Sequence, residues 1–466
     1  MKHRDPSTYN ISHLKLAFKF ILPSLIGIFL FMLPVSYENS ITIPIAILST
    51  GLQTLLSEYL LYILLITVTL SAILSLLTKL FKFQFILKNE FLNSLFNPSW
   101  IWLILRLLAF LFISLITSIE SGMTLPSSLM PIIEMIVSKD TGGLVLADLL
   151  PVLFSIFLFA GLFLPLLLNF GLLEFIGCLL VKVMRPVFGL PGRAAIDCIA
   201  SWLGDGTIGV LLTSKQYEEG FYTEREAVVI GTTFSLVSIT FSLVVINTVG
   251  LGHLFVPFYM TVTIASLVAA IIMPKLPPLS RKRDVLYNGS IPSKELEPNI
   301  KGSSLKSAFV LATQKANSQS FVQCILIDGF KNVLDMWLGV IPIVMAVGTL
   351  ALILATYTPI FKIMGLPFTP ILNLLNVPEA ATASQTLIAG FADMLLPSVL
   401  ATGISSDMTR FIIASVSVTQ LIYLSEVGAL LLGSKIPVKL WELFIIFLER
   451  TLISLPIISL IAHLIF

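Results

Sequence analysis

Long apolar stretches separated by short polar loops extend through the whole chain. Nine of these stretches are long enough to cross a bilayer, because a spanning helix needs roughly 20 residues. The predicted crossings are residues 16–35, 57–78, 101–119, 145–168, 227–248, 254–273, 333–356, 410–432 and 441–465. Segment 41–55 is apolar but short, and Pro44 and Gly51 weaken it as a helix, so it either crosses or is re-entrant. The pattern predicts an all-α polytopic integral membrane protein.

Two further apolar stretches are each interrupted near their middle by a carboxylate. Residues 194–214 carry a Gly-Asp-Gly tripeptide with Asp205 at its centre, and residues 380–402 carry Asp393. Each half is too short to cross alone, and a carboxylate in a helix break is unfavourable against lipid. We therefore predict two re-entrant helical hairpins, since broken helices at matching positions of two halves are the best sequence indicator of a transport site.

The composition supports a membrane protein and excludes several other classes. Hydrophobic residues make up 56% of the chain and charged residues only 12%, with a mean hydropathy of +0.99, which is not expected of a soluble protein of this length. The net charge of +2 and the lack of a basic stripe argue against nucleic-acid binding. The three cysteines are expected to be small buried residues, and the four scattered histidines show no metal-ligand spacing, so no metal or cofactor is predicted.

Lysine and arginine are distributed unevenly between the loops, which predicts the orientation of the chain. Loop 275–320 holds eight basic residues against three acidic ones and is placed in the cytoplasm, with the N-terminus and loop 433–440. The acidic loop 120–143 is placed outside, as is the C-terminus. This arrangement requires hairpin 194–214 to enter from the cytoplasm and hairpin 380–402 to enter from outside. The first apolar run lacks a cleavage site, so we expect an uncleaved span in the cell (inner) membrane.

Two units with the same order of elements follow from this topology. Each has a span, an amphipathic stretch, a hairpin and two further spans, and the orientation argument points the units in opposite directions. The first unit is residues 144–274 and the second is residues 321–466. Residues 1–143 are predicted to form a scaffold of helices, and 275–320, which contains several Pro and Gly residues, a flexible cytoplasmic linker. Inverted repeats with paired hairpins suit alternating access around a site near mid-membrane.

The sequence around the first hairpin resembles a known membrane domain. Residues 185–194 read Arg-Pro-Val-Phe-Gly-Leu-Pro-Gly-Arg-Ala and run into the tripeptide at 204–206, a pattern similar to the nucleoside-recognition or Gate domain. The resemblance covers residues 145–466, and the whole chain looks like the YjiH-like membrane proteins of that group. Concentrative nucleoside transporters, spore maturation membrane proteins and the membrane part of ferrous-iron transporters share the domain, although this chain has no phosphate-binding loop of an attached G domain. The resemblance implies a transporter-like or channel-like protein and says little about the solute.

The candidate substrate-binding residues all lie on the two hairpins. They are Asp205, Gly204, Gly206, Asp197, Asp393, Gln385, Thr386, Ser384 and Ser398. Asp205 and Asp393 are placed at the breaks, where helix ends expose unpaired backbone groups to a solute or ion. The alternative is that each of these carboxylates caps a half-helix or bonds the partner hairpin. The polar residues on the arms can contact a polar solute, or they can form the interhelical hydrogen bonds common in membranes.

Glu426 is the strongest candidate for coupling transport to a cation. It lies in the middle of a predicted crossing, where an ionisable residue is a functional candidate by default. Gln420 lies six residues earlier and is included with it. The alternative is a structural pair of Glu426 with Arg410 or Gln420.

The leading function hypothesis is a secondary transporter of a small polar organic solute, for example a nucleoside-like one, driven by Na⁺ or H⁺. The alternative is a gating or channel subunit that works with a second Gate-domain membrane protein. An enzyme is not expected, since the sequence has neither a His-Glu-x-x-His nor a Gly-x-Ser-x-Gly motif. The expected partners are the lipid bilayer, the solute, and either further copies of the chain or the second membrane protein.

Overall fold

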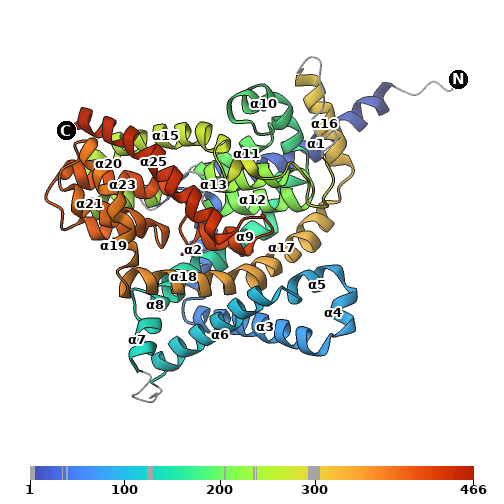
Figure 1. The fold of residues 1–466 in the computed structure, drawn as a ribbon. Helices are drawn as coiled ribbons and strands as arrows, with labels where there is room; N and C mark the ends of the chain where they lie inside the picture. Colours follow the sequence, from blue (N-terminus) through green and yellow to red (C-terminus); the bar gives the residue numbers. More distant parts are fainter. Residues whose placement is uncertain are drawn as a thin grey trace.

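The computed structural model describes residues 6–33, 35–37, 40–122, 130–203, 206–234, 237, 239–291 and 305–466. Within these residues the chain is helical apart from one small antiparallel sheet of β1 (Val35–Tyr37) and β2 (Ser40–Thr42) (Figure 1). Six described helical runs are long and apolar enough to cross a membrane: Leu60–Phe81, Trp100–Glu120, Gly142–Leu168, Gly252–Arg281, Gln323–Tyr357 and Leu440–Ile465. The predicted class, an all-α membrane protein, is confirmed.

The N-terminal part of the chain forms a series of helices. They are α1 (Pro6–Met32), α2 (Pro44–Leu55), α3 (Leu60–Phe81), α4 (Gln84–Lys88), α5 (Glu90–Phe96), α6 (Trp100–Glu120), α7 (Met130–Val137) and α8 (Gly142–Leu144). In Figure 1, α3 to α7 group together, and α18 runs between them and the later helices. Segment 41–55 begins in β2 and then forms the 12-residue helix α2, which packs against α9 and is too short to cross a bilayer alone.

The middle of the chain contains the first predicted hairpin. Its elements are η2 (Val145–Leu149), α9 (Leu150–Leu168), α10 (Leu172–Phe188), α11 (Ala194–Leu203), α12 (Gly206–Glu218), α13 (Glu224–Thr233), α14 (Ile239–Thr248), η3 (Gly252–Leu254), α15 (Phe255–Ile272), η4 (Met273–Lys275) and η5 (Leu279–Arg281). Helices α11 and α12 pack along each other as the two arms of the hairpin. Each arm is too short to span a bilayer.

The last part of the chain follows a connecting helix, α16 (Leu305–Asn317). Its elements are η6 (Gln323–Asp328), α17 (Gly329–Asp335), η7 (Met336–Val340), α18 (Ile341–Tyr357), α19 (Ile360–Gly365), η8 (Leu366–Phe368), α20 (Thr369–Leu374), α21 (Ala380–Leu387), η9 (Ile388–Phe391), α22 (Leu396–Ala401), α23 (Asp407–Gln420), α24 (Val427–Gly433) and α25 (Leu440–Ile465). Helices α21 and α22 are the arms of the second hairpin.

Two crossings that the sequence predicts as continuous helices are broken. Stretch 227–248 divides into α13 and α14, and stretch 410–432 divides into α23 and α24. In the second break, Leu421 has a left-handed φ of +60°, which a bulky residue rarely adopts. The Tyr423 hydroxyl holds this turn, because it accepts from the Leu421 N–H at 3.1 Å and lies 3.0 Å from the Ser417 carbonyl oxygen, near the end of α23. Each half of the chain therefore has a hairpin followed by a discontinuous helix.

The prediction that residues 275–320 form a flexible linker is wrong for the described residues 305–317. Residues 305–317 form α16, which packs against α1 and α10, with Ala308, Ala312 and Ala316 fully buried. Gly171, the residue before α10, has a φ of +94° and lies directly against the backbone of Ala312. This close approach leaves no room for a side chain at residue 171.

Replacing Gly171 with alanine is expected to lower the free energy of unfolding by about 2–5 kcal/mol. A left-handed non-glycine residue costs roughly 1–2 kcal/mol and overpacking a further 1–3 kcal/mol. The added Cβ atom would lie 2.3 Å from the Ala312 carbonyl oxygen. Thermal unfolding in detergent measures the change. Gly51→Ala is the control, since nothing lies within 4 Å of its Cβ position, and an unchanged midpoint for Gly171→Ala would contradict the packing of α16 on α10.

Candidate functional site

The tip of the second hairpin lies against the break between α23 and α24. The backbone N–H of Leu424 donates to the Phe391 carbonyl at 2.8 Å, and the N–H of Ser425 donates to the Ala392 carbonyl at 2.9 Å. Leu424, Ser425 and Ala392 lie outside helices and Phe391 ends the 3₁₀ turn η9, so the hairpin tip supplies carbonyls to N–H groups that the break leaves without helical partners. This mutual pairing is how non-helical backbone can be accommodated at membrane depth.

Asp393 lies at the hairpin tip and joins it to the break. Its Oδ1 accepts from the backbone N–H of Leu395 at 2.8 Å, just before α22 begins, and its Oδ2 accepts from the Ser425 hydroxyl at 2.8 Å. No lysine or arginine of the described residues lies within 4.0 Å of this half-buried carboxylate. Asp393 therefore forms local hydrogen bonds near the start of a half-helix, which is close to the structural alternative considered from the sequence. Its contact with a solute stays a prediction.

Gln420 links the end of α23 to the first arm of the second hairpin. Its Nε2 donates to the Leu387 carbonyl and to the Thr451 hydroxyl, both at 3.0 Å. Its Oε1 is buried without a hydrogen-bond partner and faces Gly390, where an added Cβ would lie only 2.0 Å away. The glycine at residue 390 therefore lets the amide oxygen of Gln420 approach the hairpin backbone.

Glu426 lies at the end of the same break, immediately before α24, and is half-buried. The alternative structural partner Arg410 is engaged elsewhere, since it pairs with Asp407 and its Nη1 donates to the Val249 carbonyl at 2.9 Å. A role of Glu426 in cation coupling stays a prediction.

Arg450, in the middle of α25, joins the two broken helices to each other. Its Nη1 donates to the carbonyl of Thr233, the last residue of α13, at 2.9 Å, and its Nε donates to the carbonyl of Thr419 near the end of α23. Both carbonyls lie at helix C-termini, which carry partial negative charge. The side chain is fully buried, so one guanidinium stabilises the ends of helices from both halves of the chain.

The sequence analysis did not identify Arg450, although a signal was present. A single arginine lies in the middle of the predicted crossing 441–465, and an ionisable residue at that depth is a functional candidate by default. The candidate residues were chosen where an apolar stretch is interrupted. Arg450 lies inside a stretch without a break, so that criterion did not select it.

Asp197 connects the two arms of the first hairpin. Its Oδ1 accepts from Gln216 Nε2 at 3.0 Å, and its Oδ2 accepts from the Thr213 hydroxyl and the Tyr222 hydroxyl, each at 3.0 Å. The carboxylate is 1% exposed, so these donors replace water around it. In this conformation Asp197 holds the hairpin together, and its predicted contact with a solute is untested.

The tip of the first hairpin falls partly outside the described residues. Gly204 and Asp205 are not among them, and Gly206 is described as the first residue of α12. The predicted role of Asp205 therefore stays a prediction.

The remaining candidates lie on the arms of the second hairpin. The Ser384 hydroxyl is 2.8 Å from the Thr369 hydroxyl, and the Thr386 hydroxyl donates to a backbone carbonyl of its own helix. Ser398 is fully buried and its hydroxyl has no hydrogen-bond partner, whereas Gln385 is half-buried. The interhelical alternative fits Ser384, and the unpaired hydroxyl of Ser398 leaves that residue as the better solute candidate.

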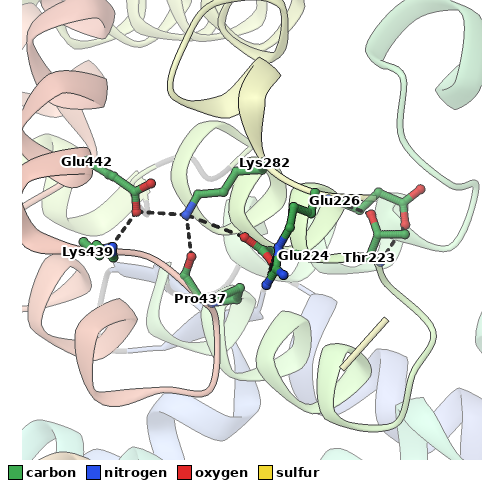
Figure 2. Close-up of polar contacts among 8 residues, drawn as sticks. Thr223, Glu224, Glu226, Lys282, Pro437, Lys439 and Glu442 are labelled. Atoms are coloured by element: carbon green, nitrogen blue, oxygen red, sulfur yellow. Dashed lines mark hydrogen bonds and ion pairs between the residues drawn. The ribbon is translucent and has the colours of Figure 1, made fainter. Parts of the chain in front are cut away.

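A second group of polar contacts is an ionic cluster in which Lys282, Glu442 and Glu224 are largely buried and Arg283 is exposed (Figure 2). Lys282 Nζ contacts Glu442 Oε2 at 2.8 Å, the Pro437 carbonyl at 2.6 Å and Glu224 Oε1 at 4.0 Å. Arg283 also pairs with Glu224, at 3.0 Å. We call Glu224, Lys282, Arg283 and Glu442 the Lys282 cluster. It joins the start of α13, the segment after α15 and the start of α25, so the linker is held by both halves of the chain.

The loops predicted to share a side of the membrane lie together. The Lys282 cluster brings together loops predicted to be cytoplasmic. At the other end of α25, His463 lies 2.9 Å from the Leu375 carbonyl, and Arg410 reaches Val249 nearby in the region predicted to be outside. The grouping of these loops is compatible with the predicted topology, whose orientation in the membrane stays a prediction.

Comparison with known proteins identifies the domain that contains the first hairpin. The family model described as nucleoside recognition (Gate) matches residues 150–252, which include α9 to α14. An uncharacterized protein of Alkalihalophilus pseudofirmus is 49% identical over 450 residues, which are 96% of this chain and 94% of the relative. No solved structure matches the chain. The chain therefore belongs to the family of membrane proteins that contain the nucleoside-recognition (Gate) domain, as the resemblance in its sequence implied.

Proposed function

We propose that this protein is a secondary transporter of a small polar organic solute, in the YjiH-like group, that works by alternating access with cation coupling. The observation that carries the proposal is the contact between the second hairpin tip and a broken helix, made through Asp393 and Ser425. Paired broken helices with polar groups at their ends are the usual construction of a transporter site. The Gate domain is associated with transport and nucleoside recognition, which favours this class over an enzyme.

The proposed transport unit is a pair of inverted repeats, residues 144–274 and 321–466, on the scaffold 1–143. The support is the recurring order of elements, in which a hairpin is followed by a discontinuous helix and then by a continuous one. Arg450 lies between the two discontinuous helices and binds the end of each. Movement of one repeat against the other would change the surroundings of both breaks at once, as alternating access requires.

The solute would bind between the two hairpin tips, near Asp205 and Asp393, and the coupling ion would bind near Glu426 and Gln420. The buried amide oxygen of Gln420 supports this assignment, because it has no hydrogen-bond partner and can accept from a proton carrier or ligate Na⁺. Either ion remains a candidate for coupling, and no further cofactor is proposed.

Cysteines placed at Glu219 and Thr402 are expected to label from opposite sides of the membrane. Both residues are exposed, one after the first hairpin and one after the second. The experiment uses a background in which Cys178, Cys198 and Cys324 are replaced by alanine, with membrane-impermeant maleimide applied to intact and to opened vesicles. The inverted-repeat model predicts labelling at 219 only from the cytoplasmic side and at 402 only from outside. Labelling of both from one side would rule out inverted repeats.

The second candidate function is a gating or channel subunit that needs another Gate-domain membrane protein. The family match to a single region of the chain is compatible with this reading. Uptake by proteoliposomes that contain only the purified chain distinguishes the two functions. Transport against a solute gradient, driven by Na⁺ or H⁺, supports the transporter, whereas activity only after co-reconstitution with a partner supports the subunit.

A further inference from the structure

Two arginines are almost completely removed from water and form no close ion pair among the described residues. Arg106 is 4% exposed and Arg450 is 0% exposed, and neither forms an ion pair within 4.0 Å in the described part of the chain. Burying an ion costs several kcal/mol unless paired charge or hydrogen bonds compensate it. Both side chains have only partial compensation, since each also retains a buried nitrogen without a hydrogen-bond partner.

Arg450 has bonding capacity left at the point where the two halves meet. Its Nε and Nη1 donate to the carbonyls of Thr419 and Thr233, and its buried Nη2 has no hydrogen-bond partner in the part of the chain that the structure describes. If the residue only capped the helix ends, a neutral donor would serve at lower desolvation cost. The positive charge of Arg450, with Nη2 available to donate, is suited instead to an anionic group that enters when the two halves of the chain move relative to each other.

Arg106 is held on the scaffold by groups that carry no charge. Its Nη1 donates to the Ser75 hydroxyl at 2.6 Å and to the Leu95 carbonyl at 2.8 Å, while its Nε is buried without a partner. These bonds fix the guanidinium in place between α3, α5 and α6. The arginine is therefore preorganised, which reduces the entropy cost of binding a ligand.

A cavity of about 270 Å³ lies beside Arg106. Its walls come from the scaffold, the second arm of the first hairpin and the loop after α24. Lys215 and Lys435 line it with Arg106, as do Glu218 and Asp335. Lys215 contacts the two carboxylates at 3.1 and 3.7 Å, whereas Arg106 and Lys435 form no ion pair within 4.0 Å among the described residues. The three cations and two carboxylates leave the cavity one net positive charge, which favours an anionic ligand.

We propose that the transported solute is a small organic anion, with a carboxylate or a phosphate that Arg106 and Lys435 bind at the cavity and Arg450 binds at the meeting point of the two broken helices. This inference rests on the proposed transport function and narrows its solute class. Guanidinium groups bind carboxylate and phosphate through parallel hydrogen bonds, and such charge-assisted bonds are about twice as strong as neutral ones. A coupled Na⁺ or H⁺ would then offset the negative charge of the solute during transport.

The test measures thermal unfolding of the purified full-length chain with matched neutral and anionic probes. The pairs are uridine with uridine 5′-monophosphate, and glycerol with glycerate. A ligand that binds only the folded state raises the unfolding midpoint. We expect at least one anionic probe to raise the midpoint while its neutral partner does not. Arg450→Met should weaken binding of that probe by roughly two orders of magnitude, as removal of a buried charged hydrogen bond does.

Three variants make this test specific. Arg450→Lys keeps the charge and should retain part of the affinity, and Arg106→Lys tests the cavity without altering the helix breaks. Arg281→Gln is the matched control, because Arg281 is exposed and should leave binding unchanged. If Arg450→Met does not fold, binding of the anionic probe by Arg450→Lys and Arg106→Lys tests the proposal.

The inference is overturned if no anionic probe raises the midpoint, if the neutral partners raise it equally, or if neither Arg106→Lys nor Arg450→Lys weakens binding. Proteoliposome uptake of the same probes separates this inference from the proposed function. If an anion binds but is not transported across the membrane, the proposed transport function is contradicted and the anion-binding site is supported. Transport of a neutral probe alone would leave the transport function and overturn the anionic solute.

Discussion

Replacing Lys282 with methionine is expected to lower the free energy of unfolding by roughly 3–5 kcal/mol, the usual cost of removing one partner of a buried ion pair. The Lys282 and Glu442 side chains are each 9% exposed and their charged atoms lie 2.8 Å apart. Without the ammonium, Glu442 would keep only the Lys439 N–H among its present contacts in Figure 2. Chemical unfolding of the detergent-purified protein measures the loss.

Two further variants distinguish loss of the ion pair from loss of packing. Lys282→Met combined with Glu442→Leu removes both charges and should recover most of the stability, because an apolar pair of similar volume often replaces a buried ion pair at little cost. Lys282→Arg keeps the charge and should lose less than the methionine variant. A change below about 0.5 kcal/mol for Lys282→Met, the range of ordinary surface substitutions, would mean that water screens the cluster.

The sequence carried enough information to predict that these two apolar stretches are interrupted, because the breaks contain residues that apolar helices avoid; that the stretches are re-entrant stays a prediction. A carboxylate beside glycine interrupts 194–214, and Asp393 interrupts 380–402, so the departure from the pattern is local and visible. The structure has α11 with α12, and α21 with α22, in these places. The membrane class also followed from composition, since apolar stretches of this number and length have no soluble counterpart.

The breaks in the two later helices could not be predicted in the same way, because tertiary contacts stabilise them. Residues 421–424 are Leu-Ile-Tyr-Leu, which continue the apolar pattern without glycine or proline. Their departure from the helix depends on the Tyr423 hydroxyl and on pairing with Phe391, which is about 30 residues away along the chain and is not visible locally. Tertiary context overrode local propensity here, as it commonly does.

Helix α16 is the opposite case, because its sequence contains a helical pattern that the linker prediction did not take into account. Ala308, Ala312 and Ala316 recur every four residues, the spacing of one face of a helix, and all three are buried against neighbouring helices. The basic residues and the prolines and glycines earlier in the loop favoured a flexible linker instead. Small residues at this spacing allow helices to approach closely, so they indicate a packed helix even within a polar loop.

Asp393→Asn is expected to reduce solute uptake at least tenfold while it changes the free energy of unfolding by only about 1 kcal/mol, the net value of one hydrogen bond. The structure supplies the reason for the small change in stability. Asparagine can still accept from the Leu395 N–H through its oxygen, and its amide nitrogen can donate to the Ser425 hydroxyl, which turns to accept. The substitution therefore removes the negative charge and nearly preserves the bonds that hold the hairpin tip to the helix break.

Ser425→Ala provides the matched comparison, because it keeps the carboxylate and removes one of its two hydrogen bonds. A hydrogen bond to a charged group contributes about 1.5–3 kcal/mol, so this variant should lose more stability than Asp393→Asn and retain more uptake per folded molecule. Uptake is measured in proteoliposomes and divided by the amount of folded protein from size-exclusion chromatography. If the charge of Asp393 takes part in binding or coupling, stability and uptake will rank the two variants in opposite orders. If the carboxylate only joins the tip to the break, both quantities will fall together, and the transport site must then depend on other polar groups at the two hairpin tips.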